Sequence, residues 1–349
     1  MNTLAPSPQS APEESSGTLA PANRWQACPA DLTAWGSGPV MAVLDDHAVL
    51  DFSGPDTRAF LQGQTTVDIA ALAPDAWQLG GYCTAKGRLL AIFAAWAHAE
   101  GVRVLLPAGI APAIQGRLSM FVLRSKVRIA DASATWTALG VFGAGASAAL
   151  AAAGVPIPAG PGQSQVLADD ERVTRMPAGA GCAERLVLVI RAERRAHWIG
   201  ALSGVAPVGP ELWWWSQIDA GVPAIVRGIE ELFVPQSLNL EVLGGVNFRK
   251  GCYPGQEIVA RSQYLGKLRR RMFLAHAGAL GPDGDIHADG AVEAIGRIVL
   301  AAAAPGGGWD LLFECPTDRA QAAGLHAGSA DAPPLQLRAL PYALFDPTA

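Results

Sequence analysis

Long apolar runs are absent from this sequence, although half of its 349 residues are hydrophobic. Gly, Pro or charged residues interrupt each apolar run well before the roughly 20 residues that a helix needs to cross a bilayer. The first 24 residues contain neither the basic segment nor the long apolar segment of a secretory signal. We therefore expect a soluble, cytoplasmic protein.

Cysteine is scarce, and metal-binding patterns are missing. The five cysteines are odd in number and widely scattered, which is typical of reduced thiols rather than of a disulfide framework. No cysteine pair has CxxC spacing, and the histidines form neither HxH nor HExxH. A Walker loop and a GxSxG elbow are also absent, and Gly143 with Gly145 is only a fragment of a dinucleotide fingerprint. We expect no metal site, no resident cluster and no nucleotide or serine-hydrolase site.

Lysine is rare as well, because the 26 basic residues include only Lys86, Lys126, Lys250 and Lys267. The net charge of −5 argues against a protein coated overall in nucleic acid. Residues 249–271 depart from this balance, with a marked basic excess over a single acidic residue. Such a segment can bind the carboxylate tail of a ligand or a phosphate backbone, but it is also typical of a solvated strand edge.

The succession of patterns predicts a mixed α+β protein. We expect a disordered tail over 1–24, a main region over 25–265 with a subdomain near 131–205, and a small C-terminal β-barrel domain over 266–349. The main region should begin with a strand pair, 40–44 and 48–52, and a helix that ends at Gly63. Further elements are expected as strands at 89–96, 102–106, 127–129, 186–190, 272–276, 297–300, 311–313 and 335–340, and as helices at 107–118, 144–153 and from Pro210.

The densest group of special residues is the segment 249–257, here named the signature turn. It predicts a turn that feeds a helix ending at Gly266, with Cys252 near the positive end of the helix dipole. Basic neighbours Arg249 and Lys250 should favour the thiolate of Cys252, which predicts a functional thiol tuned by both. The alternative is a half-buried structural cysteine. The remaining residues expected to shape the turn are Gly251, Tyr253, Gly255, Gln256 and Glu257.

A second thiol, Cys83, precedes Lys86, a glycine and Arg88 at the start of an apolar strand. This group could face the same cleft as Cys252. A hairpin connection with a solvated lysine explains it more simply and is the favoured interpretation.

Three consecutive tryptophans, 213–215, precede Asp219 in the helix predicted to begin at Pro210. An aromatic wall beside a carboxylate suits a flat pterin, because the ring faces stack and the ring edge presents paired N–H donors. Core packing alone explains at least two of the three tryptophans, and a helix-end charge is the alternative for Asp219.

Taken in order, these blocks resemble the YgfZ family of folate-binding, T-protein-like proteins over residues 43–271. The third block carries the sequence lysine-glycine-cysteine-aromatic-x-glycine-glutamine-glutamate over 250–257, which separates this family from true T-proteins. The other matching positions are Phe60 to Gly63, Thr65, Thr66 and Asp68 in the first block, Cys83 and Lys86 to Arg88 in the second, and Pro235, Gln236, Asn239 and Leu240 before the third.

The resemblance implies the three-lobed aminomethyltransferase fold, with tetrahydrofolate or a one-carbon-substituted folate in a central channel. It also implies that Asp219 holds the pterin, at a position where T-proteins use Glu. Lys86, Arg88 and Asp68 are the further folate contacts expected from the matched blocks.

Two departures from the T-protein pattern, and one from the YgfZ pattern, restrict the chemistry. T-proteins carry an aspartate pair in the strand where this chain has Leu, Leu and Ala at 89–91, so no general base remains there. They tend to have Asp at the position of Cys252, and the YgfZ family usually has Asn where this chain has Val67. Glycine cleavage is therefore not expected.

Three functions remain open at this stage. The first is a folate-dependent accessory factor that assembles or repairs iron–sulfur clusters in particular enzymes and so supports tRNA thiolation indirectly. The second is a one-carbon transferase acting on an amine. The third is a protein that binds tRNA directly through 261–271, with steep salt dependence.

Overall fold

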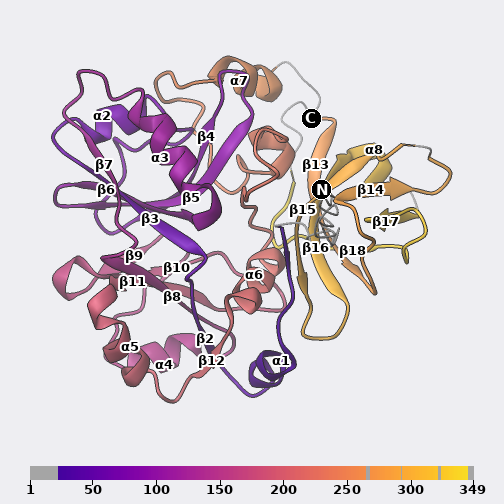
Figure 1. Ribbon diagram of the computed structural model, residues 1–349, viewed down its shortest axis with the longest axis horizontal. Coiled ribbons are helices and arrows are strands. Elements are labelled where there is room, and N and C mark those ends of the chain that lie inside the picture. Colours follow the sequence, from indigo (N-terminus) through magenta and orange to yellow (C-terminus); the bar gives the residue numbers. More distant parts are fainter. Residues whose placement is uncertain (1–22, 265–267, 292, 321–323, 345–349) are drawn as a thin grey trace, which may run out of the picture.

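A computed structural model describes residues 23–264, 268–291, 293–320 and 324–344. Three β-sheets surround the helix α6 (Pro210–Asp219), and Figure 1 shows this arrangement. The predicted α+β class and three-lobed fold are confirmed. The predicted helix end at Gly266, the neighbouring Lys267 and the division at residue 265 lie outside the described residues.

The first sheet is antiparallel and runs in the order β4-β5-β6-β3-β7. Helix α2 ends at Gly63 as predicted, and α3 buries Ile114 and Leu118 on one face. The elements of this part are β3 (His47–Ser53), α2 (Thr57–Gln62), β4 (Trp77–Cys83), β5 (Leu89–His98), β6 (Gly101–Pro107), η1 (Ala108–Ile110), α3 (Ala111–Ser119) and β7 (Arg128–Asp131).

The second sheet runs in the order β12-β2-β8-β11-β10-β9, with only the β12–β2 pair parallel. Strand β2 belongs to this sheet, although it lies before residues 131–205, which were predicted to form a subdomain. Its elements are α1 (Pro29–Trp35), β2 (Val40–Val43), β8 (Trp136–Phe142), α4 (Ala146–Ala152), β9 (Ser164–Val166), η2 (Ala168–Asp170), β10 (Arg172–Arg175), β11 (Arg185–Arg191), η3 (Ala192–Arg194), α5 (Arg195–Ala201) and β12 (Ala206–Val208).

The predicted strand pair at 40–44 and 48–52 is wrong in its pairing. Both strands exist, but β2 pairs with β8 in the second sheet and β3 pairs along its full length with β6 in the first. Residues 44–46 therefore cross between sheets instead of closing a hairpin. An apolar pattern defines a strand and its buried face but does not select its partner, and the longer β6 offers β3 more ladder hydrogen bonds than the four-residue β2.

The third sheet runs in the order β17-β14-β15-β16-β13-β18 and curls into a half-barrel, which confirms the predicted C-terminal β structure. A separate apolar cluster lies inside it, with Phe313 and Leu311 fully buried. Its elements, with those that lead into it, are η4 (Pro235–Leu238), α7 (Gln256–Tyr264), β13 (Arg270–Ala277), β14 (Asp285–Ala288), β15 (Gly296–Ala303), β16 (Trp309–Pro316), α8 (Thr317–Ala320), β17 (Leu325–Ala327) and β18 (Gln336–Arg338).

The first described residues are held by this third sheet, so the predicted disordered tail does not reach residue 24. Strand β1 (Arg24–Trp25) lies parallel to β15, and the Asn23 side chain donates hydrogen bonds to the carbonyl oxygens of Ile298 and Val299. The local composition gave no sign of this, because the partner strand lies far along the chain. Residues 1–22 lie outside the described residues.

Helix α6 is buried along most of its length and supports the second and third sheets. Pro210 opens it as predicted, and it packs against β1, β2, β8, β15 and β16. Trp214 stacks on Trp25 with ring centroids 4.1 Å apart, and the indole N–H of Trp215 donates to Asp310 at 2.9 Å. These two tryptophans are core residues, and Trp213 lines a cavity.

Candidate functional site

The signature turn is shaped by Asn247, which lies just before it, and by its own Gly255. The Asn247 side-chain oxygen accepts hydrogen bonds from the backbone N–H groups of Arg249 and Lys250, at 2.8 and 3.1 Å. Gly255, with φ of +81°, then turns the chain into α7. The predicted turn that feeds a helix is therefore confirmed.

Lys250 fastens this turn to the first part of the molecule. Its side chain is buried, and its Nζ donates hydrogen bonds to the carbonyl oxygens of Gln62 and Thr65 at the end of α2. The ammonium group also lies 5.0 Å from the centroid of the Tyr253 ring. Burial lowers the pKa of Lys250 to about 8, and the nearby Asp68 carboxylate opposes that shift. The predicted tuning of Cys252 by Lys250 stays a prediction.

Cys252 faces solvent, together with Arg249 and Glu257. The alternative of a half-buried structural cysteine is therefore wrong. Tyr253, by contrast, is buried, and burial raises its pKa. The signature turn thus buries its lysine and tyrosine and exposes its thiol.

The connection between β4 and β5 is a tight hairpin turn, as the simpler interpretation predicted. Thr84 N–H donates to the Arg88 carbonyl oxygen at 2.8 Å, and Gly87 N–H donates to the Thr84 carbonyl oxygen at 2.9 Å. Cys83 is 1% exposed, and burial raises its pKa to about 12, so the neutral thiol dominates at physiological pH. Lys86 is exposed.

The two turns lie against each other. A Cβ on Gly255 would lie 2.5 Å from the Thr84 carbonyl oxygen and 2.6 Å from the Gly87 Cα, closer than side chains tolerate. Gly87, with φ of +69°, in turn approaches Ile258 on α7. The structure therefore brings the second and third matched blocks into backbone contact.

Asp68, from the first matched block, joins this assembly from its outer side. One of its carboxylate oxygens accepts hydrogen bonds from the Gln62 side chain at 3.0 Å and from the Ala71 N–H at 3.2 Å. Asp68 therefore caps the loop that presents the Lys250 acceptors. A folate contact by Asp68, Lys86 or Arg88 stays a prediction.

Asp219 is fully engaged within the protein. Its carboxylate accepts hydrogen bonds from the N–H groups of Gly181 and Cys182, at 2.8 and 2.9 Å, and from Arg338 at 2.7 Å. It is 1% exposed. Asp219 thus joins α6 to the segment before β11 and to β18, and contact with a pterin would require one of these bonds to open. The sequence pattern around Asp219 did not reveal Arg338.

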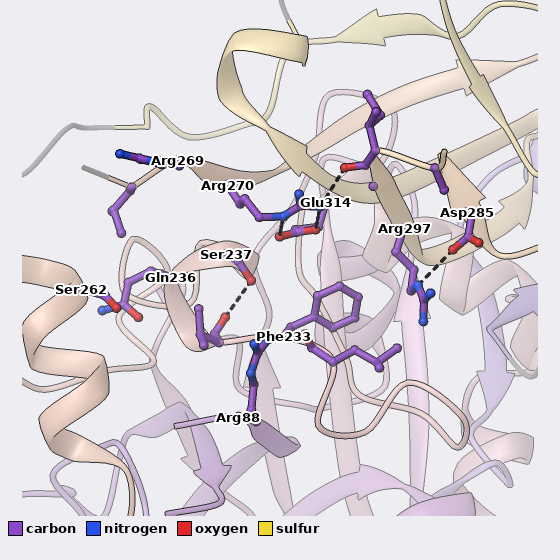
Figure 2. Close-up of a pocket in the computed structure, with 16 residues that line it drawn as sticks. Arg88, Phe233, Gln236, Ser237, Ser262, Arg269, Arg270, Asp285, Arg297 and Glu314 are labelled. Atoms are coloured by element: carbon purple, nitrogen blue, oxygen red, sulfur yellow. Dashed lines mark hydrogen bonds and ion pairs between the residues drawn. The ribbon is translucent and has the colours of Figure 1, made fainter. Parts of the chain in front are cut away.

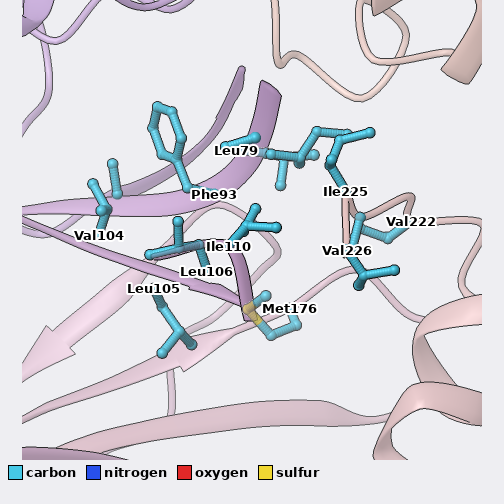
Figure 3. Close-up of a cluster of buried hydrophobic side chains, with 14 of the residues drawn as sticks. Leu79, Phe93, Val104, Leu105, Leu106, Ile110, Met176, Val222, Ile225 and Val226 are labelled. Carbon is cyan, nitrogen blue, oxygen red and sulfur yellow. The ribbon is translucent and has the colours of Figure 1, made fainter. Parts of the chain in front are cut away.

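A central apolar cavity of about 50 Å³ lies between the first sheet and α6, and Figure 3 shows apolar side chains of this region. Leu79, Phe93 and Trp213 form part of its wall. Leu79 also lines a larger cleft of about 440 Å³, which contains Pro177, the residue after the inner cavity's Met176. The two hollows are therefore neighbours.

Gln217 is the polar side chain that sequence reasoning undervalued. It lies on α6, lines the inner cavity and is 9% exposed. Within the described residues its carboxamide has no hydrogen-bond partner, so both a donor and an acceptor are available to a ligand. The signal that the sequence offered for a role of Gln217 was its position, two residues before Asp219.

In the ranges that the structure covers, no helix is long and apolar enough to cross a membrane. Over the same ranges, no group of three or more His, Cys, Asp or Glu side chains is arranged to hold a metal ion.

Comparison with known proteins finds no matching family model. The chain is 35% identical over 237 residues to the tRNA-modifying protein YgfZ of Pectobacterium carotovorum, covering 67% of this chain and 69% of the relative. It is 29% identical to the protein of the same name from Sodalis glossinidius, covering 86% and 92% of the two chains. The glycine cleavage aminomethyltransferase T of Bartonella henselae has a similar fold, with TM-score 0.72, 17% identity and coverage of 90% and 89%.

Proposed function

Since the chain belongs to the YgfZ family, we propose that it binds tetrahydrofolate and serves the assembly or repair of iron–sulfur clusters in particular enzymes. Its relatives are named tRNA-modifying proteins, and support of cluster-containing tRNA-modifying enzymes connects the two activities. The observation that carries the folate part is the buried carboxamide of Gln217 in an apolar cavity of a T-protein fold.

The side chains that line the inner cavity are of the types that suit a pterin ring. Small-molecule sites are mostly apolar, with a few polar groups that fix orientation. Phe93 and Trp213 supply flat apolar surface, and Gln217 supplies one donor and one acceptor for the ring edge. The inner cavity is smaller than the usual range of roughly 300–1,000 Å³, so side chains move when the ligand enters, while the outer cleft falls within that range.

The reactive group in this proposal is Cys252 rather than a carboxylate. Residues 89–91 of β5 are buried and apolar, so that stretch of strand offers no general base and argues against aminomethyl transfer. Bound tetrahydrofolate supplies a carrier for one-carbon units. The exposed thiol of Cys252, on a turn fixed by Lys250 and Asn247, is accessible to a partner protein.

Anaerobic calorimetry with tetrahydrofolate tests the pocket. The wild-type protein is expected to bind in the micromolar range, Gln217→Leu at least tenfold more weakly, and the exposed control Gln165→Leu normally. Cys252→Ala should bind like wild type. Absence of wild-type binding, or equal behaviour of the two glutamine variants, would overturn the folate site.

The iron–sulfur part needs a separate measurement. An oxidatively damaged [4Fe–4S] enzyme is incubated with iron, sulfide and the protein, and cluster recovery is followed by its visible absorbance. We expect faster recovery with the wild-type protein and no acceleration with Cys252→Ala, while Cys83→Ala retains the effect. Equal recovery with and without the protein would contradict this role.

A further inference from the structure

An open cleft with four arginines lies between the hairpin turn of the first sheet, the loop before η4, and the third sheet (Figure 2). Its volume is about 670 Å³. The arginines come from separate segments: Arg88 from the hairpin turn, Arg269 and Arg270 from the start of β13, and Arg297 from β15. We name it the arginine cleft.

Two of these arginines are paired within the cleft. Arg270 forms a bidentate pair with Glu314, at 2.6 and 2.7 Å, and Arg297 Nε lies 3.1 Å from an Asp285 carboxylate oxygen. These two acids are the carboxylates among the described residues that line the cleft. Four guanidinium groups against two carboxylates leave a local excess of positive charge.

Arg88 and Arg269 carry that excess. Arg88 Nη1 donates to the Leu232 carbonyl oxygen at 2.7 Å, which positions the guanidinium and leaves further N–H donors for a ligand. Arg269 is exposed at the opposite wall, and Figure 2 shows both side chains at the cleft. Arginines presented in this way bind phosphate oxygens through paired hydrogen bonds.

Gln236 adds a second kind of contact at the cleft wall. Its Nε2 donates to the Val259 carbonyl oxygen at 2.6 Å, which orients the carboxamide. Its buried Oε1 has no hydrogen-bond partner among the described residues. Because Gln236 is fully buried, a hydroxyl group reaches this oxygen only when the cleft wall opens around it. A ribose 2′-hydroxyl would then supply the missing donor, which phosphate oxygens do not.

We propose that the arginine cleft binds the phosphodiester backbone of an RNA strand. Its openness, its arginines from several segments and an acceptor for a 2′-hydroxyl fit a ribose-phosphate chain. This activity goes beyond the proposed folate-dependent role, because the cleft is separate from the Gln217 cavity and its residues do not line that cavity.

Fluorescence anisotropy with an unmodified tRNA transcript, titrated from 50 to 200 mM salt, tests the proposal. Arg88→Ala/Arg269→Ala should bind at least tenfold more weakly, with a slope of log K against log salt shallower by about 2. The control Arg124→Ala/Arg227→Ala removes equal charge from exposed sites outside the cleft and should bind like wild type. An unchanged slope in the first variant, or an equal loss in the control, overturns the proposal.

A milder variant guards against misfolding, and other ligands distinguish an RNA strand from other phosphate compounds. Arg269→Ala alone leaves the Arg88 anchor to Leu232 intact and should lose about one unit of salt slope. DNA of the same sequence should bind more weakly than RNA, and tight binding of a ribonucleoside 5′-monophosphate without tRNA binding would overturn the RNA assignment. Unchanged tetrahydrofolate titration in Arg269→Ala, which keeps Arg88, distinguishes a failure here from a failure of the folate site.

Discussion

The hairpin turn at 83–88 and the signature turn at 249–257 have similar compositions but opposite burial. Each contains a cysteine, a lysine followed by glycine, and a nearby arginine. In the hairpin turn the thiol of Cys83 is buried and Lys86 is exposed, whereas in the signature turn Lys250 is buried and the thiol of Cys252 is exposed. The two turns are packed against each other through Gly255 and Gly87.

Because of this inversion, one cysteine of the two packed turns has a packing role and the other is accessible for chemistry. The buried Cys83 packs as a small apolar residue, with its pKa raised to about 12 by burial. The buried Lys250 joins two segments, and its neighbour two positions along, Cys252, is left accessible. Composition marks both turns as special, but only burial shows which thiol is available for reaction.

The largest expected effect comes from breaking the contact between the turns with Gly255→Ala. A left-handed alanine costs roughly 1–2 kcal/mol, and overpacking against the Thr84 carbonyl oxygen costs roughly 1–3 kcal/mol more. We expect a loss of about 3 kcal/mol in urea unfolding. In Gly251→Ala the new methyl group meets no described atom within 4 Å, so the loss should stay below about 0.5 kcal/mol. Equal losses would show that the turns are not tightly packed.

Thiol labelling sharpens the contrast between the two cysteines. In a Cys28→Ser background, which removes another exposed thiol, Cys252 should react with a disulfide reagent about a hundredfold faster than Cys83 in the native protein. The fast phase should vanish on Cys252→Ala and persist on Cys83→Ala. A fast phase that survives Cys252→Ala would contradict the assignment.

The two lysines provide the next test. Lys250→Met leaves the carbonyl oxygens of Gln62 and Thr65 without their donor, and we expect a loss of about 2 kcal/mol in the free energy of unfolding. Lys86→Met changes an exposed residue and should stay within about 0.5 kcal/mol of wild type. Similar losses in both variants would mean that Lys250 does not fasten the turn.

Lys250 should also make the stability of the protein depend on pH. Burial lowers its pKa in the folded protein to about 8, from 10.5 for an ordinary lysine. Between these values the unfolded chain binds more protons than the folded one, so this residue makes stability rise with pH. The stability of wild type relative to Lys250→Met should therefore increase from pH 8 to about 10.5 and stay level below pH 8. Parallel pH profiles of the two proteins would rule this out.

Local patterns predicted much of the fold correctly. Pro210 and Gly63 marked a helix start and a helix end, and the apolar runs marked strands of all three sheets. The pairing of strands was harder to predict, as β2 and β3 show. Alternation of apolar residues does not encode which strand lies alongside. Contact between the second and third matched blocks was left open by the sequence, and the tertiary structure decided both the contact and the burial of each side chain in it.

The sequence by itself determined the class of elements, the special turns and the family, since these depend on local backbone chemistry and on ordered residue identities. Only the tertiary structure decided that Asp219 is held by Arg338, that the Gln217 carboxamide in the cavity has no hydrogen-bond partner among the described residues, and that Arg88 and Arg269 line one cleft. These outcomes depend on which distant segments exclude water from each side chain, and burial of that kind is a property of the assembled chain.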